Sequence, residues 1–467
     1  MFSDGRVVRE IGPRLTMTTW GETPDAERRP AYWWSPDWSL TFPTETAGAW
    51  DVARPGPAGL TKIVDGLRSA GERLRELPSR QIADALGRVG ERILDEEKAE
   101  LSSFVAAEAG FSPVMALRVV EGMAEGWTRP ALRRLLEAEF DNPAVLDGFT
   151  SVRNRLLHAR GPGLTFHLGA GSVPGVTATS VIRALLVKSP SLAKPGAGDV
   201  ALTVALLRLL WREAPEVAAG AAVLYWEGGA PANHPVETLA LAEAKQVVAY
   251  GGPEAMERVR ELAGPETPVL FHGPRTGVVV AAAETDPAGV AEAAALFDQR
   301  GCVSPHIVLF VGESEEALQW GRSLEEELQA LESAIPPGPV PLEVSARLHQ
   351  LRGALDLRGA SGESVGPLGD HVLVADLEDV EPVGARAVWV VRCENEGAVE
   401  AALRRLGPVL QSVGIGDPGL RERLAPAAAA AGATRIVAIE RLAFPPPEWI
   451  HDGRGPLREL VRWAERE

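Results

Sequence analysis

The stretch Leu164-Thr-Phe-His-Leu-Gly-Ala-Gly-Ser-Val-Pro-Gly175 decides the fold class of this chain. Its first five residues are typical of a buried strand, Gly169 to Gly175 form a turn, and a helix is expected through about Leu186. Further strands and helices are predicted near Leu192 and at 200–211, 221–226 and 246–250. Strands that alternate with helices at this rhythm indicate an α/β fold with a parallel sheet covered on both faces.

The remaining regions have different patterns. Residues 1–60 are rich in Trp and Pro, and we expect an arm laid over the body of the protein, because exposed aromatic residues favour aggregation. Residues 61–160 have a helical pattern, and a second strand–helix series runs through 269–311 and resumes at 371–440. The apolar positions Leu457, Leu460, Val461 and Trp463 predict an amphipathic helix at the end of the chain.

Composition limits the class of protein. The chain has 467 residues, 45% of them hydrophobic, and its 47 basic and 64 acidic residues give a formal net charge of −17. An acidic surface repels nucleic acid phosphates and anionic lipids, so we expect no nucleic acid partner. The segment Met1–Pro13 is charged where a signal peptide needs an apolar run, and no apolar stretch reaches about 18 residues, so we expect a cytoplasmic protein without a membrane span.

Two cysteines, Cys302 and Cys393, are too few and too far apart for a disulfide framework or a zinc site. The eight histidines are scattered, so we expect no metal. Cys302 lies in Asp298-Gln-Arg-Gly-Cys-Val-Ser-Pro305, a turn between a helix and a strand. Gly301 gives room for an incoming carbonyl, and Arg300 favours the thiolate. By itself, a lone cysteine is still more often buried and inert, which is our interpretation of Cys393.

Two lysines near the Gly-rich turn are candidate ligands of an anion. Lys188 and Lys194 flank Ser189-Pro-Ser191, near the end of a predicted strand, and ligands of open α/β sheets collect at the carboxyl edge. The glycine spacing differs from the Rossmann fingerprint, and no acid follows at about 20 residues to hold a ribose. From these residues alone, the turn is either a ligand cradle or a connection, and each lysine is either a ligand or a solvated side chain.

The order of these features resembles the aldehyde dehydrogenase superfamily, and more closely the long-chain acyl-CoA reductases that supply aldehyde to bacterial luciferase. The resemblance covers roughly residues 60–467. Its matching stretches are 167–174, 186–189, the cysteine loop 298–305, Gln411-Ser-Val-Gly-Ile415 and Trp449-Ile-His-Asp-Gly453. It implies an aldehyde dehydrogenase-like α/β fold, in which a coenzyme-binding domain and a catalytic domain are each built on a mostly parallel sheet.

The resemblance also implies roles for individual residues. Cys302 becomes the catalytic cysteine, Lys194 a ligand of the adenosine ribose, and Gly251 and Gly252 a border of the coenzyme site, with Lys188 close by. The superfamily usually has an asparagine in the turn to hold the oxyanion, and Ser172 stands there. The shorter reach of Ser172 leaves more of this task to the backbone N–H of Cys302.

Hydrolytic members of the superfamily carry a glutamate after the coenzyme domain that activates water. The stretch Thr267–Ala283 contains no carboxylate, which favours reduction, because a thioester intermediate must survive until hydride arrives. His272 and His306 are the candidate proton donors.

The resemblance therefore implies NAD(P)H-dependent reduction of a fatty acyl-CoA thioester to an aldehyde through an acyl-cysteine intermediate. NADPH is the expected coenzyme, with NADH as an alternative, because Ala197 stands where an acid would repel a 2′-phosphate. Coenzyme A is a substrate moiety, acyl-transferring enzymes are expected partners, and the chain is expected to form a homo-oligomer.

The alternative functions are a short-chain CoA-acylating or phosphate-linked semialdehyde dehydrogenase, and a non-catalytic scaffold that channels acyl groups. The expected domains are an arm at 1–60, a coenzyme-binding domain at 61–268, a cysteine domain at 269–430 and a returning C-terminal segment at 431–467.

Overall fold

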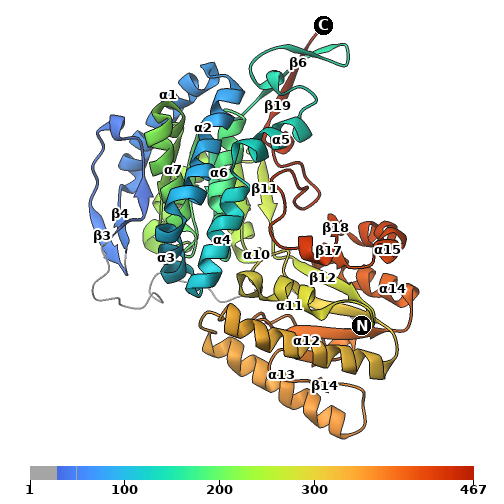
Figure 1. The fold of residues 1–467 in the computed structure, drawn as a ribbon. Helices are drawn as coiled ribbons and strands as arrows, with labels where there is room; N and C mark the ends of the chain where they lie inside the picture. Colours follow the sequence, from blue (N-terminus) through green and yellow to red (C-terminus); the bar gives the residue numbers. More distant parts are fainter. Residues whose placement is uncertain (1–28, 49) are drawn as a thin grey trace. The chain divides into compact units, whose positions relative to one another are not determined.

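The computed structural model describes residues 29–48 and 50–467, which form two units (Figure 1). The smaller unit is Pro274–Pro445. The larger unit contains the described residues up to Gly273 together with Pro446–Glu467. The C-terminal segment therefore belongs to the larger unit, and the chain passes between units at Gly273/Pro274 and again at Pro445/Pro446, slightly later than the expected boundaries.

The larger unit is built on a six-stranded sheet. Its strand order is β11 (Val269–His272), β10 (Gln246–Tyr250), β7 (Thr165–Leu168), β8 (Ser191–Lys194), β9 (Ala221–Leu224) and β2 (Tyr32–Trp33). The first five strands are parallel, and β2 pairs antiparallel with β9. The predicted α/β sheet is confirmed, and the stretch 164–175 supplies its central strand and the turn that follows.

Helices and two small sheets complete the larger unit. The helices are α1 (Gly56–Glu76), α2 (Ser79–Arg92), α3 (Lys98–Ala109), α4 (Pro113–Glu125), α5 (Arg129–Glu139), α6 (Val176–Leu186), α7 (Val200–Glu213), α8 (Pro215–Ala218), α9 (His234–Glu243) and α10 (Pro253–Leu262). The small sheets are β1 (Arg29–Pro30), β4 (Trp50–Ala53) and β3 (Thr44–Ala47), and β19 (Arg462–Arg466), β6 (Arg155–Arg160) and β5 (Thr150–Val152). Leu60, Ile63 and Leu67 of α1 pack on Phe166 and Leu192 of the sheet, which explains the apolar spacing of α1.

The described part of the aromatic arm packs against this unit. β2 extends the sheet, Trp33 and Trp50 are buried, and Tyr32 stacks on Trp34 with ring centroids 4.8 Å apart. The arm expected at 1–60 stays a prediction as a domain, because α1 already begins at Gly56 and residues 1–28 and 49 lie outside the described residues.

The smaller unit has a seven-stranded sheet with apolar side chains on both faces. Its order is β14 (Gly366–Pro367), β15 (Val372–Val374), β16 (Val388–Cys393), β13 (Pro305–Val311), β12 (Thr276–Ala281), β17 (Leu410–Ile415) and β18 (Arg435–Val437). Its helices are α11 (Pro287–Ala295), α12 (Ser314–Ala334), α13 (Leu342–Ala360), α14 (Glu396–Leu406) and α15 (Pro418–Ala431). Ile307 and Leu309 face one core while Val308 and Phe310 face the other, as expected for a parallel sheet buried on both sides.

The predicted C-terminal helix is wrong. Residues Arg462–Arg466 form strand β19, which pairs antiparallel with β6, so Trp463 lies opposite Ala159. The apolar residues that imitated a helical pattern are divided between this strand and the short turn Arg458–Leu460 before it. Hydrogen bonds to a distant strand decided the conformation here, and local periodicity does not encode them.

No single helix among the described residues is long and apolar enough to cross a membrane. The bent pair Ser79–Ala109 and Pro113–Glu125 passes such a test, by length and composition only.

Two buried carboxylates cap helices beside the Gly-rich turn. Asp199 accepts hydrogen bonds from the backbone N–H groups of Gly175 (2.5 Å) and Thr177 (2.7 Å) at the start of α6. Glu108 accepts from Val200 and from Ala201 (2.7 Å) at the start of α7. Burial raises the pKa of Asp199 to about 6, and the hydrogen bonds from Thr177 and Gly175 oppose this rise.

We expect Asp199→Ala to lower the free energy of unfolding by about 2 kcal/mol, because two buried N–H groups lose their acceptor. Asp199→Asn keeps one acceptor oxygen and should lose about half as much. Urea unfolding followed by circular dichroism measures both variants. A loss below about 0.5 kcal/mol for the alanine variant would show that the caps do not stabilise the fold.

Candidate functional site

The cysteine loop of the smaller unit has an unusual backbone. Cys302 lies between the short helix Leu296–Gln299 and β13. Phe297, Asp298 and Gln299 have positive φ angles of 59°, 48° and 63°. Residues other than glycine rarely adopt this left-handed conformation, and where they do, the surroundings must compensate for a strain of about 1–3 kcal/mol each.

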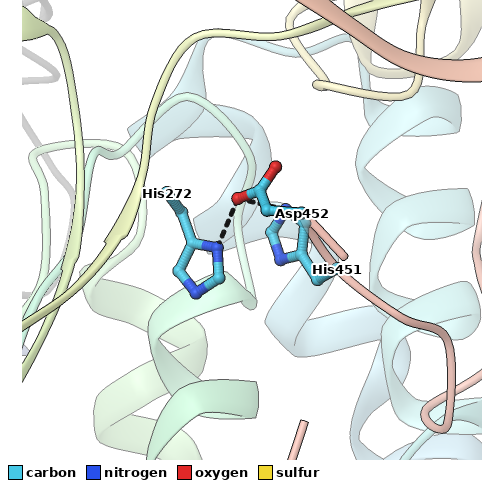
Figure 2. Close-up of side chains that lie close together, drawn as sticks. All are labelled: His272, His451 and Asp452. Carbon is cyan, nitrogen blue, oxygen red and sulfur yellow. Dashed lines mark hydrogen bonds and ion pairs between the residues drawn. The ribbon is translucent and has the colours of Figure 1, made fainter. Parts of the chain in front are cut away.

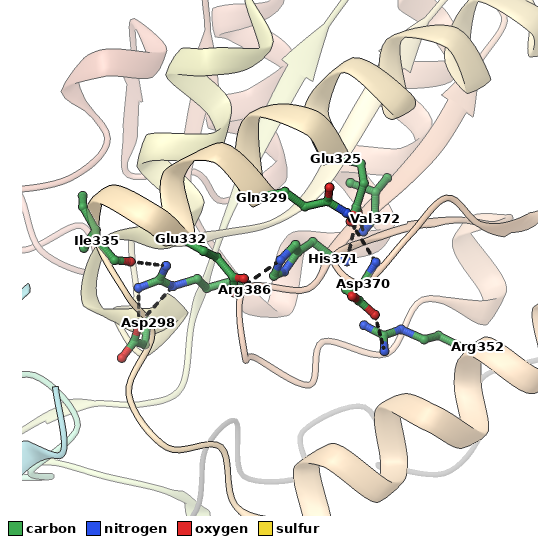
Figure 3. Close-up of polar contacts among 10 residues, drawn as sticks. All are labelled: Asp298, Glu325, Gln329, Glu332, Ile335, Arg352, Asp370, His371, Val372 and Arg386. Carbon is green, nitrogen blue, oxygen red and sulfur yellow. Dashed lines mark hydrogen bonds and ion pairs between the residues drawn. The ribbon is translucent and has the colours of Figure 1, made fainter. Parts of the chain in front are cut away.

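Buried polar contacts hold this backbone in place (Figure 3). Arg386, which is 1% exposed, donates to Oδ1 of Asp298 from Nε (3.0 Å) and Nη2 (2.7 Å). The other carboxylate oxygen of Asp298 accepts from the N–H of Gly338 at 3.1 Å. The side-chain amide of Gln299 donates to the carbonyl of Ala387 at 2.9 Å. The loop that carries Cys302 is thus fixed from three sides.

A second buried carboxylate, that of Glu325, holds the start of strand β15 in the same unit. Glu325 of α12 accepts hydrogen bonds from the backbone N–H groups of Asp370 (2.8 Å), His371 (2.9 Å) and Val372 (2.8 Å), as Figure 3 shows. These contacts fix the start of β15 against α12. Together with the Asp298–Arg386 pair, they make this side of the smaller unit rigid.

Of the two cysteines, Cys302 is the more exposed, and its electrostatic partner is Arg435. Cys302 is partly exposed, whereas Cys393 is buried. The pKa of Arg435 is lowered to about 10, mainly by burial and by a smaller amount by the positive charge of Arg441. The interaction with Cys302 acts to raise the pKa of Arg435. Arg435 therefore stays charged near neutral pH and favours the thiolate of Cys302. By contrast, Arg300, the positive neighbour expected from sequence, lies 3.8 Å from Asp298.

The structure supports the structural role of Cys393 and rejects His306 as a proton donor. Burial raises the pKa of Cys393 to about 11, so its thiol stays protonated and unreactive near pH 7. His306 of β13 is fully buried, and burial lowers its pKa to about 4, so its imidazole is neutral. The expectation for His306 is therefore wrong, because the sequence does not show that its strand lies inside the sheet.

In the larger unit, most of the predicted coenzyme residues meet at the carboxyl edge of the sheet. Leu168 ends β7 and pairs with Lys194, the last residue of β8, while Tyr250 and His272 end β10 and β11 opposite each other. Gly251 and Gly252 follow Tyr250 directly. The Gly-rich turn with Ser172 follows Leu168, and Ser172 is half-buried there. This edge is where open α/β sheets bind ligands.

Two loops approach each other at this edge through their backbones. A Cβ at Gly196 would lie 2.3 Å from the backbone nitrogen of Gly171, and a Cβ at Gly171 (φ 83°) would lie 2.9 Å from that of Ala197. Only glycine fits at both positions. The Gly-rich turn and Lys194-Pro195-Gly196 therefore form one continuous surface.

Lys194 is buried at this edge in a setting that suits a ligand contact. Its side chain is 9% exposed, and its Nζ lies 5.8 Å from the centre of the Tyr225 ring. Burial lowers the pKa of Lys194 to about 8, while the charges of Glu237 and Glu227 act to raise it. The lysine is thus mostly charged at pH 7 and loses its charge as the pH rises through about 8.

Lys188 lies elsewhere, so the expectation that it borders the same strand end is wrong. It follows α6 and precedes β8, at the amino end of that strand. Its Nζ lies 2.6 Å from Oδ1 of Asp147 and 3.3 Å from the carbonyl oxygen of Arg75. Lys188 therefore ties two helical regions together, and we exclude it from the candidate coenzyme contacts. The sequence places both lysines close to one strand without showing which end each one meets.

His272 has partners that the sequence does not place nearby. Its Nδ1 lies 2.7 Å from Oδ2 of Asp452, and its ring stacks on that of His451 with centroids 4.3 Å apart (Figure 2). The stretch Thr267–Ala283 has no carboxylate of its own, but the C-terminal segment brings one to its histidine. The stretch Trp449–Gly453, one of the segments that match the family, is the sequence signal for this contact, but a single sequence does not show that it meets His272.

Comparison with known proteins finds relatives of this chain. Residues 74–463 match the family described as acyl-CoA reductase (LuxC). A long-chain acyl-protein thioester reductase from Vibrio harveyi is 24% identical over 407 residues, which cover 84% of each chain. One of the same description from Photorhabdus luminescens is 24% identical over 411 residues, covering 84% of this chain and 83% of the relative.

Solved structures show the fold. Lactaldehyde dehydrogenase from Escherichia coli superposes with a TM-score of 0.70 at 15% identity, covering 91% of this chain and 94% of that one. An NAD-dependent benzaldehyde dehydrogenase from Corynebacterium glutamicum gives 0.66 at 17% identity, covering 89% and 92%. The aldehyde dehydrogenase-like fold expected from the sequence is confirmed. The chain belongs to the acyl-CoA reductase (LuxC) family and is an oxidoreductase that acts on acyl thioesters.

Proposed function

We propose that this protein reduces a fatty acyl-CoA thioester to the aldehyde with NADPH, through an acyl group carried by Cys302. The observation that carries the proposal is the contrast between the two thiols. Cys302 is partly exposed on a fixed loop beside the charged Arg435, whereas burial keeps Cys393 protonated. A reactive cysteine with an arginine near its thiolate is suited to attack a thioester carbonyl.

The carboxyl edge of the larger unit fits a nicotinamide dinucleotide. Gly171 and Gly196 let the backbone of the Gly-rich turn pack directly against that of Lys194-Pro195-Gly196, and Lys194 ends β8 beside this contact, where it can meet a ribose or phosphate. Asp199 and Glu108 each accept hydrogen bonds from two backbone N–H groups at the starts of α6 and α7, so these four groups are not available to a pyrophosphate. The α10 helix begins after Gly251-Gly252 without a side-chain cap among the described residues, which makes it the better candidate.

The residues of the chain then act in two stages. The Cys302 thiolate attacks the thioester carbonyl, and the thiolate of coenzyme A leaves, an exchange that is nearly balanced in free energy. The backbone N–H of Cys302 and the hydroxyl of Ser172 donate to the oxyanion. When bound, the reduced coenzyme supplies hydride to the acyl carbon. His272 supplies the proton that the resulting oxyanion needs, and Cys302 is released as the aldehyde leaves.

An acylated protein is a second candidate acyl donor, because the relatives are described as long-chain acyl-protein thioester reductases. An acylated protein would present the same thioester or an oxygen ester to Cys302. Single-turnover assays with long-chain acyl-CoA and with an acylated carrier protein, each followed by coenzyme absorbance, separate the two donors. Failure of both donors to yield aldehyde would overturn the proposal.

We expect Cys302→Ala to abolish aldehyde formation and to leave coenzyme binding intact, because the thiolate carries the acyl group. Radiolabelled acyl-CoA should label the native protein and not this variant. Cys393→Ala is the matched control and should keep both labelling and activity. Labelling of the Cys302→Ala protein at the native level would show that another residue accepts the acyl group.

With acyl-CoA and no reduced coenzyme, we expect a lasting acyl adduct on Cys302 and negligible free fatty acid. General-base delivery of water accelerates such a step by about a hundredfold to ten-thousandfold, and the proposed role of His272 is to serve the oxyanion instead. Intact-protein mass spectrometry measures the adduct and chromatography measures the acid. Rapid release of acid would place the protein with the hydrolytic dehydrogenases and make His272 a base for water.

At pH 7 we expect a higher kcat/KM for NADPH than for NADH, because a charged Lys194 can pair with the 2′-phosphate. Since the pKa of Lys194 is about 8, the lysine is charged below this pH, so the preference should narrow as the pH rises through it. Lys194→Met should reduce the preference about tenfold, the effect of one charge-assisted hydrogen bond. The exposed Lys245→Met is the control. A preference for NADH at pH 7 would contradict the assignment.

A further inference from the structure

The motif His451-Asp452-Gly453 forms a tight turn that no step of the proposed reaction yet uses. Asp452 and Gly453 have φ angles of 52° and 77°, and the N–H of Arg454 donates to the carbonyl of His451 at 3.0 Å. Positive φ at both central residues is the pattern of a type I′ turn, for which Asp-Gly is a favoured pair. The turn therefore sets the direction of the Asp452 side chain, which is 6% exposed.

Asp452 and His272 meet although 180 residues separate them in the sequence. His272 is the last residue of β11, and the turn brings Oδ2 of Asp452 to 2.7 Å from its Nδ1, as Figure 2 shows. A carboxylate at this distance accepts a hydrogen bond from Nδ1–H. It thereby selects the imidazole tautomer whose Nε2 carries the lone pair, and it orients that nitrogen away from itself.

The rings around His272 form a stack. Tyr250 lies on one side (centroids 4.6 Å apart, planes 18° apart) and His451 on the other (4.3 Å, 14°), and Trp449 stacks on His451 at 4.5 Å. Aromatic faces carry negative electrostatic potential, so the stack holds the imidazole rigidly and tolerates a positive charge on it.

The same geometry argues against a metal centre. The ligand atoms of His272, His451 and Asp452 lie within 4.8 Å of one another. The lone pairs of an imidazole lie in the plane of its ring, however, and two nearly parallel rings one above the other cannot both point at one ion. The hydrogen bond between His272 and Asp452 is the better account of the cluster.

Other charged groups share the recess that adjoins this cluster. Arg183 of α6 and Arg454 and Glu459 of the C-terminal segment line it together with Tyr250, His272 and His451. Arg183 donates to the carbonyl of Pro447 at 3.3 Å, and burial lowers its pKa. The cluster is therefore open to a recess, through which a proton can be replaced from solvent.

The position of His272 connects the cluster to the reduction. His272 ends β11, at the same sheet edge as Lys194 and the Gly-rich turn. We propose that Asp452 is a positioning residue, which fixes the tautomer and the direction of His272, the residue to which the proposed function assigns the proton of the reduction. The inference rests on the proposed thioester reduction and deepens it.

The step balances in atoms and electrons. Because Nε2 carries a lone pair in the tautomer that Asp452 selects, His272 first takes up a proton there through the adjoining recess. The thioester carbonyl carbon then accepts hydride, with its two electrons, from the reduced nicotinamide coenzyme, and its oxygen takes this proton from Nε2. In the thiohemiacetal collapse that follows, the hydroxyl returns the proton to His272 while the C–S bond breaks. Aldehyde forms and Cys302 leaves as the thiolate, ready for the next acyl group. Asp452 keeps its hydrogen bond to Nδ1 throughout.

Asp452→Asn is the most suitable test, because asparagine also tolerates a positive φ and so keeps the turn. We expect it to slow single-turnover reduction about a hundredfold, within the range of lost acid–base assistance, and to leave acylation of Cys302 by labelled acyl-CoA unchanged. The pH at which the reduction rate is half-maximal should also move. Asp356→Asn and His349→Asn, on exposed positions of α13, are the matched controls.

A double-mutant comparison makes the assignment specific. His272→Asn alone and His272→Asn with Asp452→Asn should reduce acyl-Cys302 at the same slow rate, because Asp452 acts only through His272. In the coenzyme-free protein, NMR should show a downfield Nδ1 proton of His272 that disappears in Asp452→Asn. Circular dichroism and native-level acylation confirm that each variant is folded.

The outcomes separate the inference from the function on which it rests. If the native protein is not acylated, the proposed function fails. If it is acylated and reduced, but Asp452→Asn reduces at the native rate with an unchanged pH profile, the positioning role is wrong. Additive losses in the double variant would also overturn it, since Asp452 would then act independently of His272.

Discussion

The parallel arrangement of strands is the constraint on which the candidate site depends. In a parallel sheet every strand ends at the same edge, so loops far apart in the sequence meet there. In the larger unit this edge gathers the Gly-rich turn, Lys194, Gly251-Gly252 and His272. The chemistry of the site therefore follows from topology first, and from individual side chains second.

The smaller unit presents its nucleophile in a different way. Three consecutive residues with positive φ precede Cys302, and the buried Asp298–Arg386 pair compensates for their strain. Removing one partner of such a pair leaves a buried charge and typically costs about 3–5 kcal/mol. The loop therefore needs these polar contacts to keep its conformation. In this conformation Cys302 is partly exposed, whereas Cys393 is buried.

Buried ionisable side chains have two different consequences in this structure. Asp199 and Glu108 satisfy four backbone N–H groups at the starts of α6 and α7, beside the Gly-rich turn. Lys194 keeps its charge near neutral pH in spite of burial, and Arg435 does so beside Cys302. The acidic surface of the whole chain would repel an anionic coenzyme, so the proposed function requires local cations, and Lys194 and Arg435 are the candidates for coenzyme binding and for thiolate formation.

The sequence by itself determined the α/β class and the central strand with its Gly-rich turn at 164–175, because local pattern and turn chemistry encode them. The candidate roles of Cys302 and Lys194 came from the resemblance to a family and not from the local pattern. The expectations from sequence were wrong for Lys188, for His306 and for the C-terminal helix. In each case, the end of a strand, the burial of a side chain or a distant pairing partner decided the outcome. Only the tertiary structure brought Arg435 to Cys302 and Asp452 to His272. Both contacts join residues more than a hundred positions apart. The hydrophobic pattern of a single sequence does not predict such contacts, because they depend on how the helices and strands pack.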